Sequence, residues 1–83
     1  MPRYLLELYV PRGKGLDEAT TRARQVQVGG VRYVRTMYVA EDETCFHVFE
    51  AASREALLEA ASRSGLADVR ITETVESESK EGT

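Results

Sequence analysis

The segment from Glu43 to Leu66 constrains the fold most strongly, because it is typical of one β-strand that leads into one well-defined helix. Residues 43–51 hold β-branched and aromatic side chains at strand spacing. Ser53 suits the N-cap of the helix, and Leu57, Ala60 and Ala61 form an apolar stripe along it. Gly65 followed by Leu66 is typical of a Schellman ending. The segment therefore predicts a strand over 43–51 and a helix over about 54–64.

The rest of the chain shows a second set of periodic segments. Alternating side chains over residues 3–10 predict a strand, and Asp17 is expected to cap a helix that runs to about Val28 and ends at Gly29 and Gly30. The apolar stripe of this helix is narrow, so tertiary packing must hold it. Residues 31–40 and the strand at 43–51 are predicted to form a hairpin around a polar turn. A last strand is expected over 69–75, and residues 76–83 are polar and are expected to be disordered.

The order of these elements is β-α-β-β-α-β, which predicts an α+β fold of the ferredoxin-like kind. Residues 1–75 are expected to form a single domain. In this topology the four strands form an antiparallel sheet in the order 4-1-3-2, and both helices cover the same face. The opposite face is left open.

The alternation along the strands assigns side chains to these two faces. We expect the helix-facing positions to be Tyr4, Leu6, Leu8, Val10, Phe46 and Val48, and the open-face positions to be Leu5, Glu7, Tyr9, Cys45, His47 and Phe49. An apolar row of that size is unfavourable in water. We therefore predict that two sheets pack face to face as a homodimer, in the manner of dimeric α/β-barrel proteins, with Glu7 and His47 lining the interior.

The length and composition of the chain also favour self-association. A chain of 83 residues buries a modest fraction of its surface, and its single cysteine gives no intrachain disulfide and no four-ligand zinc pattern. The formal net charge is −3 and the basic residues are scattered, so nucleic acid is not an expected partner. No apolar run reaches the length of a membrane span. We expect a soluble cytoplasmic protein that associates with itself.

Three kinds of function remain open from the residues alone. Cys45, His47 and Glu7 are three ligand types that suit a divalent transition metal such as nickel, zinc or copper. The same His47 and Glu7 suit a small-molecule enzyme of the isomerase or monooxygenase kind, and Tyr9, Tyr33 and Arg35 suit a small anionic or aromatic ligand. The third alternative is a non-catalytic interaction domain. The spacing singles out no reaction, so no catalytic residue and no organic cofactor is assigned.

Several short motifs resemble those of one family. The stretches concerned are Met1–Glu7, Met37–Asp42, Cys45–Ala51, Ala60–Ala67 and Val69–Ile71. Together they are similar to the small ferredoxin-like proteins named for a nickel-binding member, over about residues 1–75. The resemblance implies a ferredoxin-like fold, homodimerisation and, for the nickel-binding member, sequestration of nickel in the cytoplasm.

The chain also departs from the pattern of that family. The family usually has Cys where this chain has His47, and often a His-Ser pair where this chain has Thr36 and Met37. Glu7 and Glu50 match the pattern and are carried over as candidate site residues. The metal hypothesis therefore names His47, Glu7, Cys45 and Glu50, with nickel as the favoured ion.

Overall fold

The computed structural model describes residues 1–66 and 69–75, and within them the predicted order of elements is confirmed. The elements are β1 (Arg3–Tyr9), α1 (Leu16–Arg24), β2 (Arg32–Val39), a 3-10 turn η1 (Ala40–Asp42), β3 (Thr44–Glu50), α2 (Arg54–Arg63) and β4 (Arg70–Thr74). All strand pairs are antiparallel and the strand order is β2-β3-β1-β4, which is the predicted order read from the other edge. The expected tail at 76–83 lies outside the described residues.

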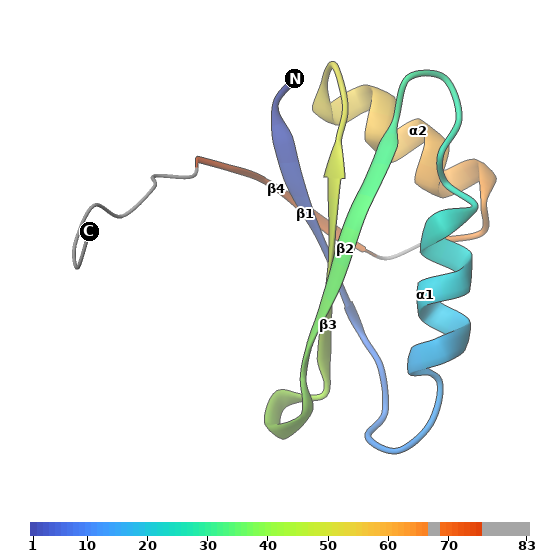
Figure 1. Ribbon diagram of the computed structural model, residues 1–83, viewed down its shortest axis with the longest axis vertical. Helices are drawn as coiled ribbons and strands as arrows, with labels where there is room; N and C mark the ends of the chain where they lie inside the picture. Colours follow the sequence, from blue (N-terminus) through green and yellow to red (C-terminus); the bar gives the residue numbers. More distant parts are fainter. Residues whose placement is uncertain (67–68, 76–83) are drawn as a thin grey trace.

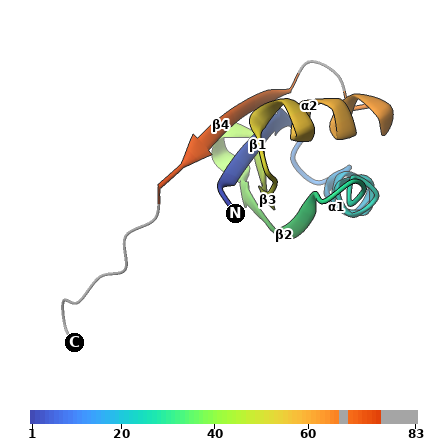
Figure 2. The same cartoon turned by 90° about the horizontal axis from the view of Figure 1, so that it is seen from above.

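Both helices lie on the same side of the sheet, as Figures 1 and 2 show. Helix α1 contacts β2 and β3, and α2 contacts β4. This two-layer arrangement is compatible with a ferredoxin-like fold. The sheet consequently has one face covered by helices and one face without them, called here the helix face and the open face.

Helix α2 has the predicted ends. The Ser53 hydroxyl accepts a hydrogen bond of 3.1 Å from the backbone N–H of Ala56, which satisfies one of the free donors of the first turn. Gly65 has a φ of +83°, and the backbone N–H groups of Gly65 and Leu66 donate to the carbonyls of Ser62 and Ala61. These two bonds make the Schellman motif that the sequence predicts.

Helix α1 differs from its prediction at both ends. Gly15, with a φ of +90°, takes the N-cap position without a side-chain cap, so Asp17 lies inside the first turn, where a carboxylate favours the helix dipole. The helix ends at Arg24 instead of continuing to about Val28. Val26 is fully buried in the core, and its β-branched side chain has low helix propensity. Core packing at Val26 thus favours an early end to a weak helix.

The helix face of the sheet forms the core with both helices. Tyr4 and Leu6 on β1, Phe49 on β3 and Ile71 on β4 pack against a set of buried helix and loop residues. That set consists of Ala23, Val26, Val31, Ala51, Leu57, Ala60, Ala61 and Leu66. The β1 assignment is confirmed, because alternate β1 side chains enter this core as expected.

The face assignment of β3 is wrong in the prediction. The register pairs Leu6 with His47, Tyr4 with Phe49 and Leu8 with Cys45, so these three β3 side chains share the helix face. Phe46 and Val48 pair with Glu7 and Leu5 and lie on the open face. Because β3 has apolar side chains on both faces, alternation alone does not show which of its faces packs against the helices. The pairing with β1 determines that face.

The open face retains an apolar centre after this correction. Leu5, Phe46 and Val48 lie at its middle, and Met37 and Val39 on β2 are 42% and 40% exposed. Val48 is only 4% exposed although no helix covers it. The predicted homodimer would cover these residues, and it stays a prediction.

Candidate functional site

The four predicted metal ligands lie on two different faces of the sheet. Cys45 and His47 are on the helix face, and Glu7 and Glu50 are on the open face, opposite Phe46 and Arg3 respectively. The expected proximity of Glu7 and His47 is therefore wrong, because a sheet separates their side chains. In residues 1–66 and 69–75 no group of three or more His, Cys, Asp and Glu side chains is placed to hold one metal ion.

Glu50 has a structural partner on each side. Its carboxylate accepts from Arg3 Nε at 3.0 Å and forms an ion pair with Arg32 Nη2 at 2.9 Å, directly across β1 and β2. The hydrogen bonds from Arg3 and Arg32 lower the pKa of the Glu50 carboxyl below its usual value. Glu50 thus joins three strands electrostatically.

His47 is the fully buried polar side chain of the core. Its ring packs edge-on to Phe49 and Tyr33, with ring centroids 6.4 and 6.3 Å apart. Burial disfavours the charged imidazolium and lowers the pKa of His47 from 6.5 to about 4. His47 is therefore neutral at physiological pH.

A chain of hydrogen bonds leads from His47 to the surface of the helix face. His47 Nδ1 lies 2.7 Å from Thr36 Oγ1, and Thr36 Oγ1 lies 2.5 Å from the Tyr33 hydroxyl. Cys45 Sγ lies close to both ring nitrogens, 3.7 Å from His47 Nε2 and 4.0 Å from His47 Nδ1, and burial raises the pKa of that thiol. Among the described residues every buried side-chain nitrogen and oxygen has a partner. The register pairs Thr36 directly with His47.

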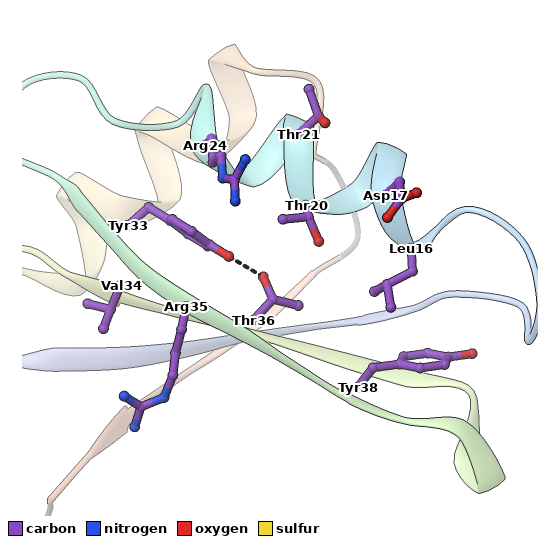
Figure 3. Close-up of a pocket in the computed structure, with 10 residues that line it drawn as sticks. All are labelled: Leu16, Asp17, Thr20, Thr21, Arg24, Tyr33, Val34, Arg35, Thr36 and Tyr38. Atoms are coloured by element: carbon purple, nitrogen blue, oxygen red, sulfur yellow. Dashed lines mark hydrogen bonds between the residues drawn. The ribbon is translucent and has the colours of Figure 1, made fainter.

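The hydrogen-bond chain ends in a groove between α1 and the edge strand β2. The groove has a volume of about 710 Å³. Figure 3 shows Tyr33, Thr36 and Tyr38 on the side of β2 that faces α1, whereas Val34 and Arg35 point away. A β-bulge between Tyr33 and Arg35 accounts for these two consecutive outward side chains. Val34 and Arg35 also line the groove, but the β2 side chains directed toward α1 are two phenols and one hydroxyl.

The helix contributes a polar wall as well. Asp17, Thr20, Thr21 and Arg24 line the groove at spacings i, i+3, i+4 and i+7, which places them on one stripe of α1. Arg24 lies at one end of this stripe, with its Cζ atom 6.0 Å from the centroid of the Tyr33 ring, and Asp17 lies at the other end (Figure 3). A helix normally seals onto a sheet with an apolar stripe. Here the seam next to β2 is largely hydrophilic on both sides, with Leu16 as the apolar side chain that α1 adds to it.

Sequence reasoning found part of this site. Tyr33 was predicted as a residue for a small ligand, and it lies in the groove. Tyr9 and Arg35 do not point into it, since the Tyr9 hydroxyl donates to Glu43 and Arg35 lies on the open face. The sequence prediction does not include the polar stripe of α1. The signal for it is the narrow apolar stripe of that helix, which leaves polar side chains on the rest of the helix surface.

Comparison with known proteins adds no relative to this picture. No family model, no curated protein and no solved structure matches the chain. Among the described residues, no helix has the length and apolar character needed to cross a membrane.

Proposed function

We propose that this protein binds a small polar molecule in the groove between α1 and β2. The observation that carries the proposal is the hydrophilic seam, in which a polar helix stripe faces the Tyr33 hydroxyl and the hydrogen-bond chain behind it. Concave sites with a few convergent polar groups are where small ligands bind. Buried polar side chains in a small core cost stability unless they are paired, and here the paired set ends at the groove.

The metal hypothesis has less geometric support. Two of its four residues, Glu7 and Glu50, lie on the open face, and Glu50 is engaged by two arginines. Cys45 and His47 alone supply two ligands, whereas protein sites for transition metals use three or four. The enzyme alternative is weakened for the same reason. It needs His47 and Glu7 to act together, and Glu7 does not reach His47.

The homodimer fits the same proposal. Two copies that pair through Leu5, Phe46 and Val48 would bury the apolar centre of the open face. The groove is lined by α1 and β2, and α1 lies on the other side of the sheet (Figure 2), so this association leaves the groove accessible. We expect one groove per chain in such a dimer.

Binding is tested by amide NMR with a panel of small polar compounds added to the labelled protein. We expect shifts at the backbone amides of Thr20, Thr21, Tyr33 and Thr36. Tyr33→Phe removes the groove hydroxyl and should weaken binding, whereas Tyr9→Phe removes a hydroxyl outside the groove and should not. If the compounds that bind shift only open-face amides, the groove is not the binding site.

A further inference from the structure

We propose that the ligand of the α1–β2 groove is a small monocarboxylate, held by the Arg24 guanidinium and the Tyr33 hydroxyl. This inference rests on the proposed function and names the class of molecule that the groove takes. It is carried by the charges of the helix stripe and by the direction in which the hydrogen-bond chain can run.

Arg24 is the cation that α1 contributes to the groove; Arg35 of β2 also lines it, but its side chain points away from α1 (Figure 3). Arg3 and Arg32 bind Glu50, and Arg63 binds Glu59. Within residues 1–66 and 69–75, the Arg24 guanidinium has the Tyr33 ring as its neighbour and no carboxylate at ion-pair distance. A guanidinium presents a planar fork of donors that matches a carboxylate. The charge that this residue leaves unpaired is therefore suited to a ligand carboxylate.

The Tyr33 hydroxyl can serve as the second donor. In one direction of the chain His47 Nδ1–H donates to Thr36 Oγ1, and the Thr36 hydroxyl donates to the Tyr33 oxygen. The Tyr33 proton is then free to point into the groove. The Tyr33 hydroxyl is the last donor of this arrangement, and an oxyanion beside Arg24 is the acceptor that completes the chain.

Asp17 limits the ligand to a single negative charge. It lies seven residues from Arg24 on the same stripe, which corresponds to about 10 Å along the helix. A second carboxylate at that end would meet a like charge. The hydroxyls of Thr20 and Thr21 lie between the two ends, and they suit a tail that carries a hydroxyl group.

The test compares three compounds of similar length by NMR titration: 4-hydroxybutyrate, its neutral primary amide of the same shape, and the cationic 4-amino-1-butanol. We expect the acid to bind the groove at least about tenfold more tightly than the amide, which is the effect of one charge-assisted pair. Arg24→Gln should remove this preference. Arg22→Gln is the matched control, because it removes the same charge from the same helix outside the groove.

The outcomes separate the two proposals. If the amide or the amine shifts the groove amides as strongly as the acid, the groove binds small molecules but the carboxylate inference is wrong. If Arg22→Gln weakens the acid as much as Arg24→Gln does, a general charge effect replaces the specific site and the inference also fails. If none of the three compounds shifts the groove amides of the folded protein, the groove proposal itself is withdrawn.

Discussion

The buried imidazole of His47 predicts that this protein loses stability in mild acid. The pKa of His47 is about 4 in the folded protein and about 6.5 in an unfolded chain, so the unfolded state binds one more proton between these pH values. Stability therefore rises with pH through this window and falls as the pH decreases. The sign follows from burial of the neutral form, because the fold excludes the imidazolium.

The size of the effect follows from the same two values. Each pH unit within the window corresponds to about 1.4 kcal/mol, so the free energy of unfolding should fall by about 2 kcal/mol between pH 7 and pH 5 and by about 3 kcal/mol by pH 4. A domain of this length has a total stability of about 4 to 12 kcal/mol. A loss of about 2 kcal/mol lowers the melting temperature of a small domain by about 10 °C.

Urea unfolding at a series of pH values measures this slope, and His47→Gln supplies the control. Glutamine does not titrate and retains a group that can bond to Thr36, so its stability should change little between pH 7 and pH 5. Glu50 does not interfere in this range. The pKa of its carboxyl is lowered by Arg3 and Arg32, so its stabilising charge is lost only at more acidic pH.

Two results would refute the reasoning. The first is the same slope between pH 7 and pH 5 in the wild-type chain and in His47→Gln, which would place the titrating group elsewhere. The second is an NMR titration in which the His47 ring takes up its proton near pH 6.5. Either result would mean that the imidazole is reached by water in solution.

Four further predictions concern the core, the open face and the metal hypothesis. Thr36→Val leaves the His47 nitrogen unpaired and should cost about 1 to 3 kcal/mol in urea unfolding, whereas Thr36→Val combined with His47→Leu should cost less than the single change. A double variant as unstable as the sum of both single changes would contradict the pairing. Met37→Asp places a charge at an exposed position of the open face and should convert a dimer to a monomer in sedimentation, and a wild-type chain that sediments as a monomer at high concentration would rule the dimer out. Nickel should leave the melting temperature unchanged if the groove is the site, and a rise that Cys45→Ala abolishes would favour the metal hypothesis instead. Gly65→Ala should cost about 1 kcal/mol in thermal unfolding because its φ is +83°, and an unchanged melting temperature would show that the helix end rearranges.

The sequence predicts the framework of this fold well because its signals are local. Ser53 and Gly65 fix the ends of α2 through hydrogen bonds with their own neighbours, and both ends are observed where expected. The strand order follows from the sequence of elements. The end of α1 was missed because it depends on Val26 entering the core, which is a tertiary effect.

The orientation of β3 could not be read from its own residues. Cys45 and Phe49 are apolar on one face, and Phe46 and Val48 are apolar on the other, so alternation allows both orientations. For a strand taken alone, a polar side chain such as that of His47 is expected on the face away from the core. The register with β1 reverses it, and a single reversal moves all three helix-face side chains at once.

That reversal changes what the central strand can do. With His47 on the open face, the strand would contribute to an interior shared between two chains. With His47 on the helix face, its ring is buried in the core of one chain, and within the described residues its hydrogen bonds lead to the groove through Thr36 and Tyr33. A neutral, buried imidazole cannot act as a surface charge, but it can set the direction of the hydroxyls bonded to it. The Tyr33 hydroxyl in the groove is therefore a donor or an acceptor according to the direction of the hydrogen bonds that begin at His47. The open face remains available for association.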